Sequence, residues 1–336
     1  MSEQENLLWL TEQDVVRLVS LDDAVESLEA IAADAQAFNV PKALGTYEGG
    51  GALQALGSVA PGLGYGGFKT WNFTPRGGGA IFSLFSTETG ALKAVIEAGA
   101  LGQLRTAAMT GLGTRWLADP GADEMAIIGT GNQAIAQVAA VNIVRPLRRL
   151  RVFGPDAGRR SAFAARVREA FTFDVVEADS VAAAVQGAPL VTLVTRAREP
   201  FLASSMLARD AHLNAVGAIL PTHAEFHQDV FERIGCIVVD DVPNTKQASR
   251  ELIERFGGPD VSAWEGVRAI GEVIRSGERP PRRDGDISLF KSVGMGLSDL
   301  AVAKLVFERA TGERLGKPIP RQSRAALRWR GQPGND

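Results

Sequence analysis

The sequence predicts an α/β fold in which a doubly wound parallel sheet, a Rossmann domain, is joined to an α+β domain formed from both ends of the chain. Three observations lead to this prediction. The chain has 336 residues, more than a single hydrophobic core usually serves. Short strand-like runs separated by glycines precede residue 98, whereas apolar strands alternate with amphipathic helices from residue 124 onward. A last helical segment, at residues 298–310, follows a polar, proline-rich stretch and is expected to return to the first domain.

The first domain is expected to begin with two short helices. Thr11 and Asp14 have the spacing of a capping box, with Asp in the place of the usual Glu. The second helix is predicted within residues 20–37, where one face would carry Val25, Leu28, Ile31 and Ala35. Residues 80–98 indicate two strands joined by a turn at 87–90, so an antiparallel sheet is expected here.

Residues 99–118 form an alanine- and leucine-rich helix that is expected to lead out of this domain. The strands of the parallel sheet are predicted at 124–129, 148–154, 172–178, 189–195, 212–218 and 235–241. We therefore predict one domain over residues 1–115 and 305–336, and the Rossmann domain over 116–304. The tail, 321–336, is expected to be partly disordered near its end.

Composition excludes several classes of protein. A formal net charge of −3 argues against a nucleic-acid-binding protein. No window approaches the roughly 20 apolar residues of a membrane helix, and the N-terminus lacks the features of a secretory signal. We expect a cytoplasmic protein that does not bind membranes. The single cysteine, Cys236, lies in an apolar run and is expected to be a buried structural thiol.

A glycine-rich turn between the first strand of the parallel sheet and its helix predicts dinucleotide binding. Gly129, Gly131 and Ala134 fit the pattern G-x-G-x-x-G/A. The first glycine allows the tight turn, the second lets the backbone approach a pyrophosphate, and the small third residue allows close packing. We predict that the whole turn binds NAD(P)H: Gly129, Thr130, Gly131, Asn132, Gln133 and Ala134.

The choice between NAD and NADP stays open. Gly154 occupies the position after the second strand where an acid would favour NAD. Asp156, two residues later, could bind the ribose or could cap the next helix. Arg159 and Arg160 could hold a phosphate or could belong to a solvated helix face. Asp156 and Arg159 are predicted cofactor-binding residues.

The sequence resembles the ornithine cyclodeaminase/mu-crystallin family. The resemblance rests on "GFKTWN", "FSLFSTETG", "LRTAA", "IIGTGNQA", "NAVGA" followed by a proline and an acid, and "SLFKSVGMGLSDLA". These segments occur in the family's order, from about residue 10 to residue 310. The resemblance implies a central Rossmann domain, a substrate and dimerisation domain built from both termini, and a homodimer. It also implies hydride exchange between a nicotinamide and the α-carbon of an amino acid or its imine.

The resemblance further implies a set of site residues. Arg105 matches the arginine that anchors the substrate carboxylate, which suits its planar, bidentate guanidinium. Lys69 matches the active-site lysine, which would polarise or protonate the substrate nitrogen. Lys42 stands where arginine is common and is a second substrate-binding candidate. Further cofactor contacts are expected at Thr106, Val216, Gly217, Lys291 and Ser292.

The loop "GAILPTHAEF" departs from the family pattern. Ile219 stands in place of the aspartate that takes a proton from the substrate ammonium in cyclodeaminases and alanine dehydrogenases, and His223 replaces a lysine. His223 is then the remaining candidate for a proton donor, since imidazole exchanges protons near neutral pH. A surface histidine is the alternative.

These residues favour an NAD(P)H-dependent reductase of small imino acids or cyclic ketimine carboxylates. Trp71 and Phe73 could line its substrate pocket or belong to the core. Two alternatives stay open. A cyclodeaminase-type lyase would need Glu225 or His223 to point into the site, and a mu-crystallin-like protein would bind NAD(P) with little catalysis. No spacing of histidines and carboxylates indicates a metal site.

Overall fold

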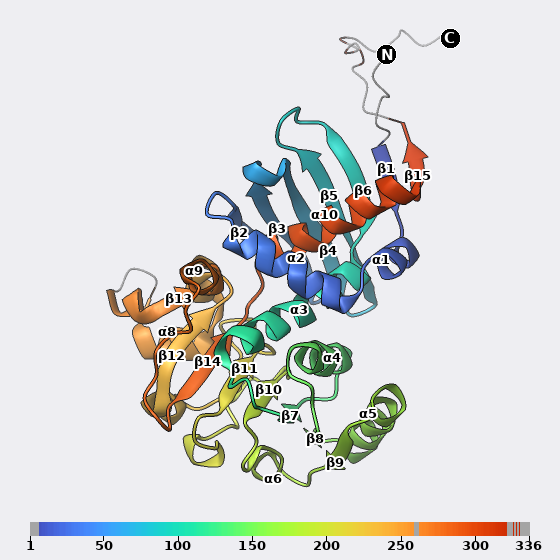
Figure 1. Ribbon diagram of the computed structural model, residues 1–336. Helices are drawn as coiled ribbons and strands as arrows, with labels where there is room; N and C mark the ends of the chain where they lie inside the picture. Colours follow the sequence, from blue (N-terminus) through green and yellow to red (C-terminus); the bar gives the residue numbers. More distant parts are fainter. Residues whose placement is uncertain (1–6, 259–261, 321–324, 326, 328, 330–336) are drawn as a thin grey trace.

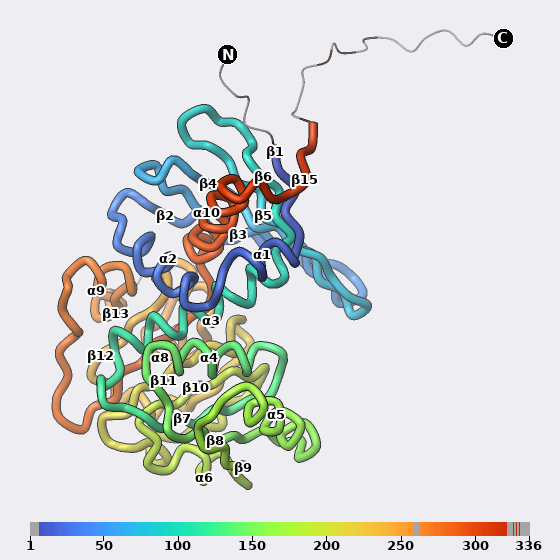
Figure 2. Tube along the Cα trace, turned by 45° about the vertical axis from the view of Figure 1, so that its right-hand side comes forward, coloured from blue at the N-terminus to red at the C-terminus, as the bar shows by residue number. Residues whose placement is uncertain are grey.

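The computed structural model describes residues 7–258, 262–320, 325, 327 and 329. Two sheets of different type lie at opposite ends of the molecule, with a long helix, α3 (Gly99–Leu117), between them (Figures 1 and 2). No helix in these residues is long and apolar enough to cross a lipid bilayer.

The first sheet has seven strands within the described residues, in the order β15-β1-β6-β5-β4-β3-β2. Neighbouring strands from β2 to β6 are antiparallel, and β1 runs parallel to β6. The strands are β1 (Leu7–Leu10), β2 (Phe38–Tyr47), β3 (Gly51–Ala60), β4 (Tyr65–Thr74), β5 (Gly77–Ser86), β6 (Leu92–Glu97) and β15 (Lys317–Ile319).

Helices cover one face of this sheet (Figure 1). The helix α10 crosses β2 to β5, and α2 packs against α10 and α3. Side chains alternate along a strand, so paired residues of β3, β4 and β5 face the same side. Leu56, Lys69 and Phe82 are paired in this way and are buried beneath the helices, whereas Gly57, Phe68 and Ser83 face the opposite side. The helices are α1 (Glu12–Leu18), α2 (Leu21–Ala33) and α10 (Gly296–Glu313).

The second sheet contains eight described strands, all parallel, in the order β13-β12-β14-β11-β10-β7-β8-β9. The chain first builds outward from β7 to β9 and then returns to β10 on the other side of β7. A sheet of this kind binds ligands outside the carboxyl ends of its strands, at the point where the order reverses. The strands are β7 (Glu124–Ile128), β8 (Arg149–Phe153), β9 (Asp174–Glu177), β10 (Leu190–Leu193), β11 (His212–Ala215), β12 (Ile234–Val239), β13 (Val267–Ala269) and β14 (Ile287–Lys291).

Helices flank this sheet on both faces, as expected for a Rossmann domain. They are α4 (Ala134–Val144), α5 (Ala157–Ala170), α6 (Val181–Val185), α7 (Val242–Ala248), α8 (Arg250–Phe256) and α9 (Ile270–Ser276). Apolar residues of the strands and helices form two buried clusters, one on each side of the sheet.

The fold class predicted from the sequence is confirmed, and so is the capping box of Thr11 and Asp14. The prediction for Ala35 is wrong, because α2 ends at Ala33 and Ala35 is exposed beyond it. The expectation of an antiparallel first sheet needs one correction, since β1 is parallel to β6. The strands β1, β2, β13, β14 and β15 were not predicted.

The predicted domain boundaries stay a prediction, and most of the tail at 321–336 lies outside the described residues. Because α10 packs on the first sheet from its start, we propose that the chain returns to the first domain at Gly296. Cys236 lies on β12 and is partly exposed. Burial raises the pKa of its thiol to about 11, so the reactive thiolate is disfavoured at neutral pH.

Candidate active site

The glycine-rich turn follows β7 and leads into α4. Gly129 adopts a φ of 116°, which favours glycine, and an added Cβ would lie 2.7 Å from the carbonyl oxygen of Val194. An added Cβ on Gly131 would meet no atom within 4 Å. Ala134, the first residue of α4, is fully buried. The turn is therefore packed against Val194 at Gly129 and open at Gly131, close to the start of α4.

These features fit a dinucleotide. The space beside Gly131 would allow the backbone to approach a pyrophosphate, and the start of α4 would favour its negative charge. Thr130 lies next to Gly154 at the end of β8, because a Cβ on Gly154 would be 3.0 Å from the Thr130 hydroxyl oxygen. The first two strands of the sheet thus meet at the predicted cofactor-binding turn.

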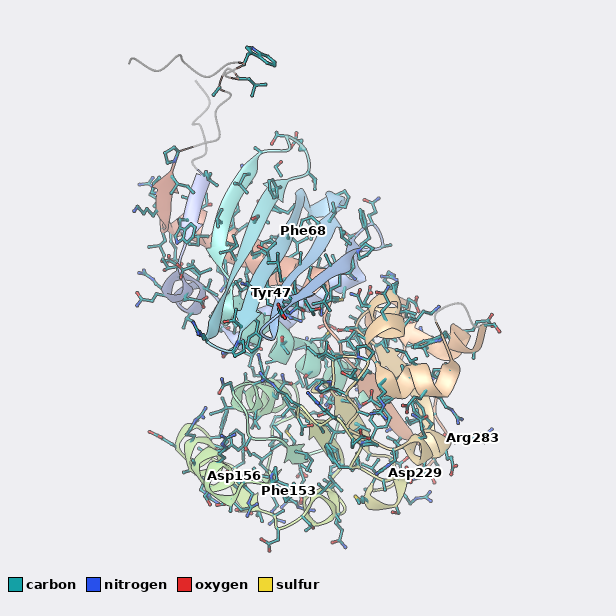
Figure 3. All side chains as sticks on the ribbon, turned by 180° about the vertical axis from the view of Figure 1, so that it is seen from behind. Tyr47, Phe68, Phe153, Asp156, Asp229 and Arg283 are labelled. Carbon is teal, nitrogen blue, oxygen red and sulfur yellow. The ribbon has the colours of Figure 1, made fainter. Side chains whose placement is uncertain are left out.

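The side chains of the residues after β8 have different partners within the protein. Asp156 is the N-cap of α5, and its Oδ1 accepts a hydrogen bond of 2.8 Å from the backbone N–H of Arg159. The guanidinium of Arg160 donates a hydrogen bond to the Gly154 carbonyl oxygen, and its Nε lies 4.0 Å from Oε2 of Glu177. The side chain of Arg159 is exposed and forms no hydrogen bond or ion pair with other described residues. Figure 3 shows Asp156 and Phe153 together beside α5.

A buried cluster of charges lies between the first sheet and the helices that cover it. The ammonium of Lys69, on β4, donates a hydrogen bond of 2.7 Å to Oδ1 of Asp299, on α10. Nε of Arg105, on α3, lies 3.2 Å from the same oxygen but does not meet the angle of a hydrogen bond. Lys69 is 5% exposed and Asp299 is fully buried. Three elements that are far apart in the sequence therefore share one carboxylate oxygen.

The position of Asp299 follows from the close packing of α10 on β3. The helix starts at Gly296, where an added Cβ would clash with the carbonyl oxygen of Gly57. Only glycine allows this approach, and it brings the first turn of α10 down to the strand beside Lys69. Asp299 was not predicted as a site residue, although it lies within "SLFKSVGMGLSDLA", one of the segments that carry the family resemblance.

The ring of Trp71 lies close to two lysines. Nζ of Lys69 is 4.9 Å from the centre of its ring, and Nζ of Lys42, on β2, is 5.8 Å away. Burial, followed by the charge of Arg105, lowers the pKa of both lysines, and that of Lys69 falls to about 8. Asp299 opposes this shift for Lys69, and Asp240 opposes it for Lys42.

Arg105 keeps its hydrogen-bonding capacity. Its side chain is 14% exposed and, apart from the ion pair with Asp299, its guanidinium has no hydrogen-bond partner among the described residues. An added Cβ on Gly294, just beyond β14, would lie 3.3 Å from its Nη1. The cluster thus adjoins the carboxyl end of a Rossmann strand, and Arg105 has terminal nitrogens free for an anion.

The residues after β14 are held by Asp240. Its Oδ2 accepts hydrogen bonds from the hydroxyl of Ser292 at 2.7 Å and from the backbone N–H groups of Val293 and Gly294. Burial raises the pKa of Asp240, and these hydrogen bonds oppose the shift. Ser292, predicted to bind the cofactor, thus directs its hydroxyl to Asp240. Lys291 is fully buried and is paired with Glu251 at 3.2 Å.

The loop after β11 is organised around Glu225. This side chain is fully buried and accepts hydrogen bonds from the backbone N–H groups of Thr195, Gly217 and Ala218 and from the Thr195 hydroxyl. An added Cβ on Gly217 would clash with both Thr195 and Glu225, so glycine is required there. Both oxygens of Glu225 are therefore occupied by the loops at the ends of β10 and β11.

The other residues of this loop are more exposed. Ile219 is 40% exposed, and His223 is partly exposed, with Nδ1 3.0 Å from the hydroxyl oxygen of Thr222. Val216 is buried just after β11. Among the other predicted residues, the hydroxyl of Thr106 donates back to the Gly102 carbonyl of its own helix. Asn132 is exposed and Gln133 partly exposed at the start of α4.

The structure thus brings together Lys69 and Arg105, with Lys42 beside the same tryptophan, and adds Asp299 to them. The roles assigned to all these residues remain predictions. Asp240, Glu225 and Glu251 support the adjoining loops. Asp240 and Glu251 were not predicted as site residues, and Glu225 was named only for the cyclodeaminase alternative. No local sequence signal indicates these acids, because their burial and their donors depend on the tertiary structure.

The profile of the ornithine cyclodeaminase/mu-crystallin family matches residues 6–314 of the chain. The protein belongs to this family. Alanine dehydrogenase of Archaeoglobus fulgidus is 31% identical over 330 residues, which cover 93% of this chain and 98% of the relative. Delta(1)-pyrroline-2-carboxylate reductase of Bacillus cereus is 30% identical over 247 residues, or 71% of this chain and 73% of the relative.

A solved structure of an archaeal alanine dehydrogenase dimer with bound NAD is similar throughout. Its TM-score is 0.85 at 27% identity, and the match covers 94% of this chain and 99% of that one. These relatives are thus named as oxidoreductases that act on carbon–nitrogen bonds, and the solved structure is a dimer with bound NAD.

Proposed function

We propose that the protein is an NAD(P)H-dependent reductase of small imino acids or cyclic ketimine carboxylates. The observation that carries the proposal is the buried cluster of Lys69, Arg105 and Asp299 next to the carboxyl ends of the Rossmann strands. It combines a guanidinium with free terminal nitrogens and an ammonium whose pKa is about 8. These are the two groups that reduction of an imino carboxylate needs from the protein.

The roles of these residues follow from their chemistry. Arg105 would bind the substrate carboxylate, since a guanidinium can form two parallel hydrogen bonds to it. Lys42, near the same ring of Trp71, would add a second positive charge. Lys69 would deliver a proton to the substrate nitrogen, because an ammonium with a pKa near the working pH gives up its proton readily. A bound reduced nicotinamide would supply the hydride for the imine carbon, which is the chemistry of that cofactor.

The surroundings of Ile219 favour a reductase over a cyclodeaminase. Oxidation of an amino acid requires a base that removes a proton from the substrate ammonium, and isoleucine cannot do this. Glu225 is a poor substitute, because both its oxygens accept hydrogen bonds within the protein. A preformed imine does not need such a base, since its carbon is already electrophilic.

We also propose that the protein is a homodimer. The face of the first sheet opposite α10 is uncovered in the described part of the chain and carries exposed apolar side chains. Figure 3 shows Tyr47 and Phe68 on this face. The outer sheet face comprises Tyr47, Leu53, Phe68 and Ile81, which are between 36% and 59% exposed. A patch of this kind favours association with another protein surface.

The proposal is tested by following the loss of NADH or NADPH absorbance with a cyclic ketimine carboxylate as substrate. L-ornithine with NAD serves as the comparison. We expect reduction of the imine without conversion of ornithine. The Lys69→Ala variant should lose turnover and the Arg105→Ala variant should bind the imino acid more weakly, while both retain nicotinamide binding. Ornithine conversion to proline, or cofactor binding without turnover of any imine by the wild type, would contradict the proposal.

A further inference from the structure

Asp299 is shared by the two cations to which the proposed function assigns the chemistry. Its Oδ1 accepts the hydrogen bond from Lys69 and forms the ion pair with Arg105. Its Oδ2 is buried and has no hydrogen-bond partner in the described residues. A fully buried carboxylate with so few donors depends on its two cations for stabilisation. The three side chains therefore form one electrostatic unit, in which a change at one cation alters the other.

We propose that Asp299 is a positioning residue that couples binding of the substrate carboxylate at Arg105 to retention of a transferable proton on Lys69. This inference rests on the proposed function. Asp299 itself would not touch the substrate, because neither of its oxygens is open to solvent. It would act by holding the ammonium of Lys69 in place and by favouring its protonated form.

The charges that face Lys69 explain the coupling. Asp299 approaches from α10, Arg105 from α3 and Lys42 from β2, whereas its neighbours on β3 and β5 are the apolar Leu56 and Phe82. Asp240, beyond Lys42, interacts with that lysine. Among these charges, Arg105 and Lys42 disfavour the ammonium form of Lys69, and Asp299 favours it.

A substrate carboxylate bound to Arg105 would offset the charge of the guanidinium. The repulsion between Arg105 and Lys69 would then decrease, and the proton affinity of Lys69 would rise. The free enzyme would thus have a lysine near its titration point, and the complex would have a protonated one. In the complex, an N–H bond of Lys69 breaks and an N–H bond forms on the substrate nitrogen with the electron pair of its C=N bond. A bound reduced nicotinamide would supply the hydride for the imine carbon, and Lys69 would be left as a neutral amine.

Asp299→Asn removes the negative charge at nearly constant shape and is the main test. Without it the pKa of Lys69 should fall further, so the protonated form is lost at lower pH. We expect the alkaline limb of the profile of kcat/KM to move at least about one pH unit downward, and the value at pH 8 to fall about fivefold or more. The loss should shrink as the pH is lowered, and Asp299→Glu should restore part of the wild-type profile. Glu308→Gln, which removes an exposed partner of Lys304 on the same helix, is the matched control and should leave the profile unchanged.

A second measurement does not depend on turnover. The titration of Lys69 can be followed by NMR in protein labelled with carbon-13 lysine, with Lys69→Arg to assign the signal. Pyrrole-2-carboxylate, a stable planar carboxylate, should raise the pKa of Lys69 in the wild type. Asp299→Asn should lower it in the absence of ligand.

The two measurements separate the two proposals. A wild type that reduces no imine contradicts the proposed function, while the NMR titration still reports on the coupling. An Asp299→Asn variant with wild-type pH dependence would overturn the inference even in an active reductase. If that variant does not fold, a wild-type Lys69 signal that pyrrole-2-carboxylate leaves unshifted would overturn it as well.

Discussion

The geometry of Arg105 leads to a specific prediction about binding of the substrate carboxylate. Its guanidinium is held by Asp299 through Nε, so its two terminal nitrogens keep a fixed orientation and have no hydrogen-bond partner in the described structure. A lysine at this position would keep the charge but would lose the planar pair of donors. Substitutions of Arg105 can therefore test the charge of this side chain separately from its planar geometry.

We expect Arg105→Ala to raise KM for the imino acid by about 10- to 100-fold, since a hydrogen bond to a charged group contributes about 1.5–3 kcal/mol. Arg105→Lys should recover only part of this loss. Steady-state kinetics on both variants, with the dissociation constant of NADPH measured by fluorescence as the control, would test it. Equal KM values for the Lys and wild-type proteins would show that the planar fork is not used.

The preference for cofactor is a second question at the scale of single residues. Asp156 is engaged as the N-cap of α5, Gly154 has no side chain, and the guanidinium of Arg159 has no partner in the described part of the chain. An arginine in this region can bind the 2′-phosphate of NADP. We expect Arg159→Ala to raise KM for NADPH about 5- to 50-fold and to change KM for NADH little, as one charge-assisted hydrogen bond is lost. Arg166→Ala, farther along the same helix, serves as the control, and a parallel loss with both cofactors would argue against a phosphate contact.

At the scale of elements, the two glycines of the turn between β7 and α4 are expected to have different roles. One is needed for folding and the other for cofactor binding. An added Cβ would be strained and crowded at Gly129 but would meet open space at Gly131. We expect Gly129→Ala to lower the free energy of unfolding by about 1–3 kcal/mol. Gly131→Ala should leave Tm unchanged and weaken NAD(P)H binding at least about tenfold, because the methyl group would occupy the space of the pyrophosphate.

Thermal unfolding and cofactor titration on this matched pair would decide the point. A Gly131→Ala protein that binds the cofactor as the wild type does would mean that the dinucleotide does not lie along this turn. A Gly129→Ala protein with unchanged Tm would mean that the turn relaxes without cost.

The strands also show how much of the fold could be predicted from the sequence. The Rossmann strands follow from local patterns, since an apolar run, a glycine turn and a helix are adjacent in the chain. The strand β14 was missed because it follows a polar, proline-rich stretch, and β1 and β15 were missed because they are short. Their pairing partners lie far away in the sequence, so no local period indicates them.

The candidate site could likewise be predicted only in part from the sequence. Lys69 and Arg105 could be assigned from motifs, whereas the role of Asp299 depends on a contact between residues 230 positions apart. The requirement for a carboxylate beside a buried lysine is general, but the sequence does not indicate which of many acids supplies it. The packing of Gly296 against Gly57, which brings Asp299 to that lysine, is a property of the tertiary structure.

At the scale of the whole molecule, one face of the first sheet carries the charged cluster, and the other is the face that we propose for association. Lys69 points toward α10 and the charged cluster, and the next residue in the strand, Phe68, points to the uncovered outer sheet face. A stable interface buries about 800 Å² on each partner. A face of four long antiparallel strands is large enough for this, and association there would leave the charged cluster on the opposite face unobstructed.

We expect the wild type to have twice the mass of the 35.6 kDa chain in light scattering after gel filtration. The double variant Leu53→Lys/Ile81→Lys should be a monomer, because burial of two ammonium groups in an apolar interface costs several kcal/mol. Val16→Lys is the matched control, since Val16 is an apolar residue with 66% exposure on α1, away from this face, and its substitution should leave the dimer intact. Dimers that persist in the double variant would move the interface to another surface. A wild type of monomer mass would leave the outer sheet face without the partner proposed for it.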